Sequence, residues 1–116
     1  MIEALPASHD AALGFRVAGD VTADDYAVLT PAVRTAVDKH GSVRVLLDLT
    51  DFHWEKAEAW GADLHFGEQF RHAIERMAIV GDHAWERWLA HLAEPFYARD
   101  AQYFTDPDQA WNWLEE

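Results

Sequence analysis

The sequence contains no cysteine, and this absence excludes several kinds of chemistry at once. Disulfide bridges, thiol nucleophiles and cysteine-ligated zinc sites all need a residue that the chain lacks. Its 116 residues must instead be stabilised by a hydrophobic core, for which the 50% hydrophobic composition is ample. We therefore expect a single domain over residues 1–116, in a reducing compartment.

Positive charge is scarce. Nine Lys and Arg residues face 21 Asp and Glu residues, so the formal net charge is -12. Such a surface repels phosphate backbones and anionic headgroups, and the scattered cations form no basic stripe. Nucleic acid is therefore excluded as an expected partner.

Long hydrophobic runs are also missing, so no transmembrane segment is predicted. The first ten residues have neither the cationic nor the apolar region of a secretion signal, which indicates a cytoplasmic protein. Enzyme motifs are absent too, because no G-x-S-x-G, G-x-G-x-x-G or Walker sequence occurs. These absences predict a protein that is not an enzyme and has no cofactor.

The most informative stretch of the sequence is residues 43–54, where an apolar run ends in acids, a histidine and aromatics. Its apolar residues alternate, since Leu46 falls on the face opposite to the one shared by Val43, Val45, Leu47 and Leu49. A strand that is apolar on both faces is typical of a parallel sheet covered by helices. Residues 43–49 are therefore predicted to be the central strand, and residues 50–54 the loop that follows it.

The rest of the chain alternates between strand and helix signals. Strands are expected at 2–5, 12–18, 77–80 and 102–104, and helices from Ala23 to Gly41, over 55–73, after Gly81-Asp82 and from Pro107. Thr22 and Asp25 resemble a capping box at the start of the first helix, and Asp106 is expected to cap the last. Pro31 should either kink the first helix or restart it with Thr30 as the cap. This order predicts an α/β fold with a mixed, mostly parallel sheet of about five strands and helices on both faces.

A binding site in such a fold is expected outside the carboxyl ends of the strands. That edge should collect Asp51, His53 and Trp54 from one loop, and His83 and Trp85 from the next. Two further acids there have simple structural roles: Asp48 is expected to accept backbone hydrogen bonds, and Asp82 to cap a helix. Asp51, His53 and His83 could together bind a divalent metal, but their spacing matches no metal motif.

Aromatic residues are abundant after the two central strands. Most of the six tryptophans are expected in the core, yet Trp60, Phe66 and Phe70 add rings to a domain with limited interior space. Phe66 lies roughly 200° from Leu64 around a helix, so the two cannot bury against one surface. Aromatic side chains that the core cannot hold, next to a cleft at the ends of the strands, are suited to binding an apolar ligand or to forming a protein interface.

Several segments resemble the SpoIIAA-like family of bacterial proteins, which is related to STAS domains and shares the fold of CRAL-TRIO (Sec14) lipid-binding domains. The resemblance rests on Leu47-Asp-Leu49 with Phe52 to Trp54, Ala59 to Leu64 with Phe66, Ala78 to Asp82 with Trp85, Pro95-Phe96, and Tyr103-Phe104 with Ala110 to Leu114. It implies the α/β fold described above. Founding members of this kind are anti-anti-sigma factors, switched by phosphorylation of a serine at the start of the helix after the central strand. This chain departs from that pattern, because its only serines are Ser8 and Ser42 and the nearest hydroxyl is Thr50.

Three functions follow as expectations. The first is a regulatory or protein-interaction module, binding a protein partner or a second copy through residues 50–54 and the helices over 55–73. The second is a carrier or sensor of a small hydrophobic ligand, held in a cleft at the carboxyl ends of the strands. The third is a metal-dependent enzyme using His53 and His83.

Overall fold

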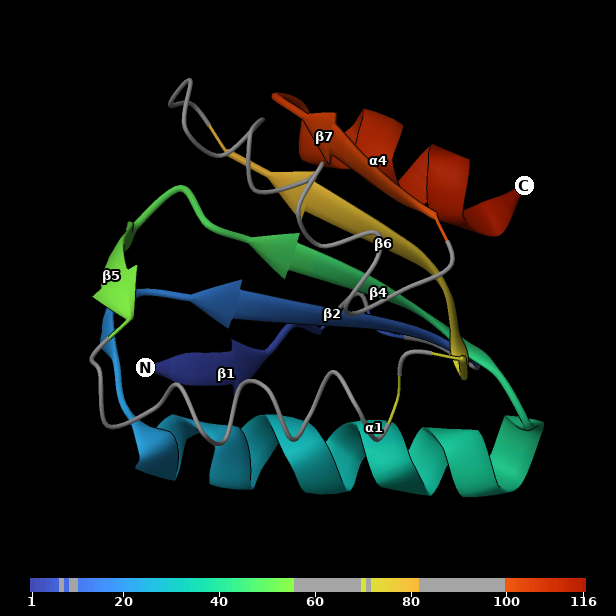
Figure 1. The fold of residues 1–116 in the computed structure, drawn as a ribbon. Helices are drawn as coiled ribbons and strands as arrows, with labels where there is room; N and C mark the ends of the chain where they lie inside the picture. Colours follow the sequence, from blue (N-terminus) through green and yellow to red (C-terminus); the bar gives the residue numbers. More distant parts are fainter. Residues whose placement is uncertain (7, 9–10, 56–69, 71, 82–99) are drawn as a thin grey trace.

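The computed structural model describes residues 1–6, 8, 11–55, 70, 72–81 and 100–116. A five-stranded sheet forms its centre, in the order β1-β2-β4-β6-β7 (Figure 1). The strands are β1 (Ile2–Ala4), β2 (Ala12–Val17), β4 (Val43–Asp48), β6 (Ile74–Val80) and β7 (Ala101–Phe104). Only β1 is antiparallel to its neighbour, while every other pairing in this sheet is parallel. The predicted mixed, mostly parallel sheet of five strands is confirmed.

The middle strand of this sheet is β4, and its two faces serve two separate cores. Val43, Val45 and Leu49 lie in the larger core with helix α1 (Tyr26–His40). Leu46 lies in the smaller core with helix α4 (Pro107–Glu115). The alternation predicted for residues 43–49 is therefore confirmed, and described helices cover both faces of the sheet (Figure 1).

Helix α1 packs on the larger core through Leu29, Val33 and Ala36, and Gly41 ends it at a positive φ of 84°. The helix runs without interruption through Pro31, so the predicted alternative of a restart at Thr30 is wrong. Pro31 cannot donate to the carbonyl of Ala27, but Ala27 is exposed and water can satisfy that oxygen. The cost of the proline is therefore small enough for packing to keep one helix.

The beginning of α1 is fixed by Asp25, as the capping-box pattern predicts. The Asp25 carboxylate accepts a 2.7 Å hydrogen bond from the Thr22 N–H and a 3.2 Å bond from the Thr22 hydroxyl. The Met1 ammonium lies 3.3 Å from the same carboxylate. Desolvation is the largest single influence and raises the pKa of Asp25, but the Thr22 and Met1 contacts together outweigh it and lower that pKa.

Because the pKa of Asp25 is lowered in the folded protein, protonation of this carboxylate at acidic pH destabilises the fold. Its contribution to stability is complete above the unfolded pKa of about 4 and is lost as pH falls through the lower, folded value. We expect Asp25→Asn to reduce the free energy of unfolding at pH 7 by about 0.2–1 kcal/mol, because the amide loses the charge that pairs with the Met1 ammonium. Urea unfolding at a series of pH values checks this. The difference between the two proteins should shrink below pH 4, and a difference independent of pH would contradict it.

Helix α4 covers the opposite face of the sheet. The Asp106 carboxylate accepts a 2.9 Å hydrogen bond from the Asp108 N–H, and Pro107 opens the first turn, as predicted. Ala110 and Leu114 are buried against Leu46, Ala78 and Val80.

No helix among the described residues is long and apolar enough to cross a membrane.

A second, two-stranded sheet was not predicted. It consists of β3 (Gly19–Val21) and β5 (Phe52–Glu55), which are parallel and lie at the end of β2 and β4 (Figure 1). The prediction of a loop over 50–54 is thus wrong for residues 52–54, because this aromatic segment finds a strand partner in residues 19–21. The helices predicted after β5 and after Gly81 lie outside the described residues, apart from positions 70, 72 and 73.

Candidate functional site

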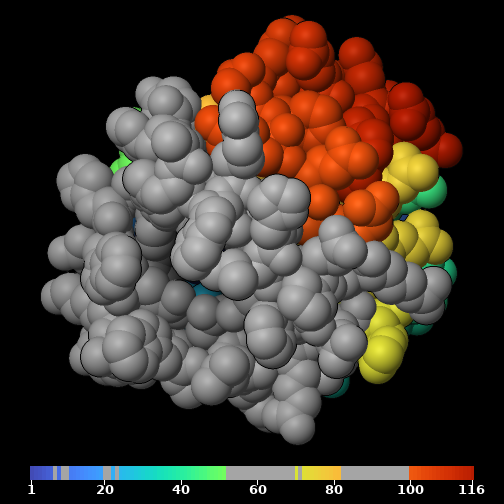
Figure 2. All heavy atoms as spheres, turned by 45° about the horizontal axis from the view of Figure 1, so that its top comes forward, coloured from blue at the N-terminus to red at the C-terminus, as the bar shows by residue number. Residues whose placement is uncertain are grey.

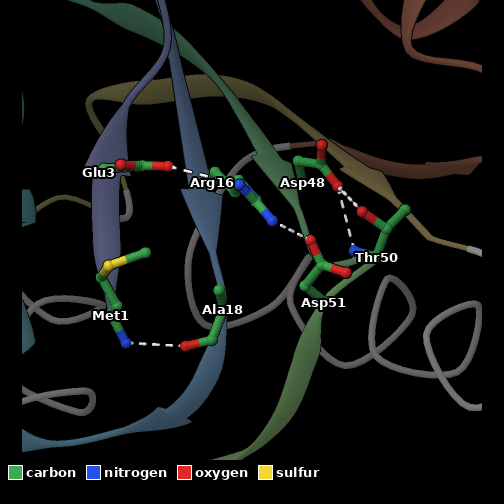
Figure 3. A network of polar contacts seen from close by, with 7 residues as sticks. All are labelled: Met1, Glu3, Arg16, Ala18, Asp48, Thr50 and Asp51. Atoms are coloured by element: carbon green, nitrogen blue, oxygen red, sulfur yellow. Dashed lines mark hydrogen bonds and ion pairs between the residues drawn. The ribbon is translucent and has the colours of Figure 1, made fainter.

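The candidate site is the edge of the main sheet where β2 and β4 end. At this edge Asp48 closes a tight turn: its carboxylate accepts bonds of 3.0 Å from the Thr50 N–H and 2.7 Å from the Thr50 hydroxyl. Asp48 therefore has the structural role that the sequence predicts, and Thr50 acts as a turn residue. The turn directs the next residue, Asp51, back toward β2 (Figure 3).

Asp51 pairs with Arg16, the next-to-last residue of β2. The Arg16 guanidinium donates a hydrogen bond to the Asp51 carboxylate and lies 3.7 Å from a carboxylate oxygen of Glu3 on β1. The hydrogen bond that Arg16 donates to Asp51, and then the negative charge of Asp51, raise the pKa of Arg16 above its ordinary value, with smaller contributions from Glu3 and Asp48. Figure 3 shows the guanidinium between the two acids. All three side chains stay accessible, with exposures of 50% for Glu3, 41% for Arg16 and 54% for Asp51.

The backbone holds this edge in place as well. The Gly19 N–H donates a 2.9 Å bond to the carbonyl oxygen of Asp51, and the Leu49 N–H donates a 2.7 Å bond to that of Val80. Gly19 has a positive φ of 64°, a conformation that glycine adopts without strain. The turn after β4 is therefore fastened to both the neighbouring strand and the following small sheet.

His53 and Trp54 lie on β5, beyond this turn. Trp54 pairs with Asp20 and Phe52 with Gly19, so His53 falls where the register shifts by one residue. Such a bulge locally bends a strand and is common beside functional sites. The structure thus brings the backbone of these two predicted site residues to the same edge as Asp51.

Phe70 differs from the other predicted site residues, because it is only 3% exposed and belongs to the larger core. The guanidinium carbon of Arg34 lies 5.8 Å from the centre of its ring. This cation–π contact comes from α1, on a face of the sheet rather than at its edge. In the part of the chain described, Phe70 therefore contributes to packing.

The remaining predicted site residues, Trp60, Phe66, His83 and Trp85, lie outside the described residues, as does Asp82. Among the described residues, no three His, Cys, Asp or Glu side chains come together to form a metal site. Both the metal hypothesis and the carrier hypothesis depend on side chains beyond the described ranges. They stay predictions.

Arg16 and Glu3 are the site residues that the sequence did not reveal. Their place depends on the pairing of β1 with β2 and of β2 with β4, which sets Arg16 opposite Glu3 on one side and Asp48 on the other. A single arginine near the end of a strand gives no signal of this kind. Arg16 lies among Glu3, Asp48 and Asp51 only because of the register in which these strands pair.

Comparisons with known proteins agree with this fold. The model of the SpoIIAA-like family matches residues 12–115. Among solved structures, the chain is similar to an uncharacterised DUF3478-family protein with a SpoIIAA-like fold from Shewanella loihica PV-4. The two share 26% sequence identity and a TM-score of 0.82, over 98% of this chain and 92% of that one. No curated protein matches the chain significantly. Because the family model covers nearly the whole sequence, the chain belongs to the SpoIIAA-like family.

Proposed function

We propose that this SpoIIAA-like domain is a protein-interaction module that catalyses no reaction. Its binding surface is formed by Glu3, Arg16 and Asp51, called here the carboxyl-edge surface. The partner is another protein or a second copy of the chain. The observation that carries the proposal is that three charged side chains are exposed at this edge and yet held in fixed positions.

A fixed and exposed set of charges suits recognition of a partner. Charges in known interfaces guide association and reject wrong partners, and they do this best when their positions are set before binding. Here the Asp48–Thr50 turn and the Gly19 hydrogen bond fix the backbone that carries Asp51. The ion pairs with Arg16 then set the directions of the side chains.

The same contacts argue against catalysis at the described part of this edge. Asp48 is occupied by two hydrogen bonds from Thr50, and the charge of Asp51 is balanced by Arg16. A general base needs a carboxylate that is free to take a proton near neutral pH. Neither carboxylate is free to act in this way, because each is engaged by the contacts just described.

The serine switch of anti-anti-sigma factors has no counterpart at this surface. The Ser8 hydroxyl accepts a 2.9 Å bond from the Gly14 N–H in the middle of β2, and Ser42 precedes β4. Neither follows the central strand. If binding through the carboxyl-edge surface is regulated, another mechanism than phosphorylation of these serines is needed.

Reversing one charge tests the proposal. Asp51→Lys should weaken association at least about tenfold. The lysine would repel Arg16, and it would place a positive charge at a position where the bound partner contacts a negative one. Asp38→Lys is the matched control, since Asp38 is an exposed aspartate on α1 and the change in net charge is the same. Light scattering measures self-association, and affinity capture with quantitative mass spectrometry measures association with other proteins.

The control variant should keep the associated protein, or the dimer, that the unmodified chain shows, whereas Asp51→Lys should lose it. Circular dichroism and urea unfolding must show that both variants are folded. Equal association of all three proteins would contradict the proposal. So would a chain that remains monomeric and captures no protein.

A further inference from the structure

The charged groups of the carboxyl-edge surface do not use all of their bonding capacity within the chain. Among the described residues, the Arg16 guanidinium donates one hydrogen bond, to Oδ2 of Asp51, and lies 3.7 Å from Glu3. The remaining N–H groups of Arg16, the second oxygen of Asp51 and the oxygens of Glu3 have no hydrogen bond in that part of the chain. Unused donors and unused acceptors therefore lie side by side on one exposed surface.

An exposed methionine lies beside these charges. Met1 is 52% exposed and stands two residues before Glu3, so the two side chains leave the extended chain on the same side (Figure 3). Methionine and arginine are among the residues that are enriched in protein interfaces. An apolar neighbour also excludes water from an ion pair and so strengthens it. The surface thus offers both an apolar contact and charges of both signs.

This surface includes the outermost strand on one side of the main sheet. That strand is β1, and the outermost strand on the other side is β7. In Figure 2, β7 and α4, in orange and red, form a continuous part of the surface on that other side. β1 has only three residues, of which Ile2 is 6% exposed, so it offers little accessible backbone for joining two sheets. We therefore expect side chains, not backbone groups, to make the contact with a partner.

From these observations we infer that the partner of the carboxyl-edge surface is a second copy of this chain, bound about a two-fold axis. A surface with an unused cation beside unused acids complements itself in this symmetry, and Arg16 of each copy pairs with Asp51 of the other. The net charge of -12 makes two copies repel in general, so they associate where an exposed arginine can meet acids. The inference rests on the proposed function, for which it names the partner.

Charge reversal in two separate variants tests this pairing. Arg16→Glu places acids against each other across the two-fold axis, and Asp51→Lys places cations against each other. Each variant alone should therefore dimerise at least about tenfold more weakly than the unmodified chain. In an equimolar mixture of the two variants, both contacts across the axis again join opposite charges, so a heterodimer should form. Native mass spectrometry identifies the heterodimer by its mass, and light scattering measures the affinities.

The matched controls are Lys39→Glu and Asp38→Lys, because both residues are exposed on α1 and the changes in net charge are the same. Both controls should dimerise like the unmodified chain. Circular dichroism must show that every variant is folded. If a single variant unfolds, the double variant Arg16→Glu with Asp51→Lys decides, because it exchanges the charges within each chain as well as between chains. It should dimerise by itself.

Dimerisation of the unmodified chain, its loss in each single variant and its recovery in the mixture support the inference. A chain that stays monomeric would overturn it, and so would single variants that still dimerise or a mixture that stays monomeric. The proposed function can survive this failure. If the monomeric chain captures another protein and Asp51→Lys loses it, the carboxyl-edge surface binds proteins and only the second copy is wrong.

Discussion

Replacement of Leu46 by alanine is expected to lower the free energy of unfolding by about 2–5 kcal/mol. Leu46 is 1% exposed and lies in the middle strand, where it packs with Ala78, Val80, Ala110 and Leu114. Its removal takes away the transfer free energy of the side chain and leaves a cavity between two rigid layers. Urea unfolding measures the change, as a lower midpoint with an unchanged slope.

The matched control for this prediction is Val28→Ala on helix α1. Val28 is 48% exposed, so its truncation should change the free energy of unfolding by less than about 0.5 kcal/mol. A similar small effect for Leu46→Ala would mean that α4 does not cover this face of the sheet in solution.

The second large effect is expected at Gly14, in the middle of β2. A Cβ atom at this position would lie 2.7 and 2.8 Å from two carbons of the Trp111 ring and 3.1 Å from Leu5. Real Cβ atoms do not approach other atoms so closely, and the partly buried ring packs against the smaller core. Gly14→Ala should therefore cost about 1–3 kcal/mol through overpacking, although alanine is otherwise better than glycine in a strand.

A double-mutant cycle isolates the cause. Trp111→Leu removes the ring that meets the new Cβ, so Gly14→Ala should cost clearly less in that background than in the unmodified chain. Thermal or urea unfolding of the four proteins gives the coupling. If the cost of Gly14→Ala is the same in both backgrounds, the close approach of Trp111 to β2 is not present in solution.

The elements that the sequence predicts well are those with local signals. The apolar residues on both faces of segment 43–49 predicted the middle strand, and Asp106 followed by Pro107 predicted the start of α4. Thr22 and Asp25 likewise marked the beginning of the first helix. In each case the residues that produce the structure are neighbours in the chain, so their chemistry can be read without knowing the fold.

What could not be predicted depends on contacts between distant segments. Residues 19–21 become a strand only because residues 52–55 lie beside them. The close approach of Trp111 to Gly14 likewise joins segments that are far apart in the sequence. The carboxyl-edge surface has the same origin, since Glu3, Arg16 and Asp51 come from three segments. The sequence predicted that Asp48 and Asp51 lie at this edge of the sheet, where the structure places them, but it did not predict that Arg16 lies beside them.

The two edges of the sheet therefore differ in chemistry. At the carboxyl edge an arginine is held between exposed acids, which forms a fixed and charged surface. At the amino edge two helices end beside a cleft whose acceptors hold a guanidinium. Substitutions at one edge should leave the other unaffected, because effects of sites without shared partners add independently.

Site-specific photocrosslinking in cells tests the proposed interaction most directly. A photoreactive amino acid placed at Glu3, an exposed position of the carboxyl-edge surface, should give a discrete crosslinked product with a partner protein or with a second copy. The same amino acid at Asp38 on α1 should not. A product at Asp38 as abundant as that at Glu3, or no product at Glu3, would contradict the claim that this domain binds proteins through its carboxyl edge.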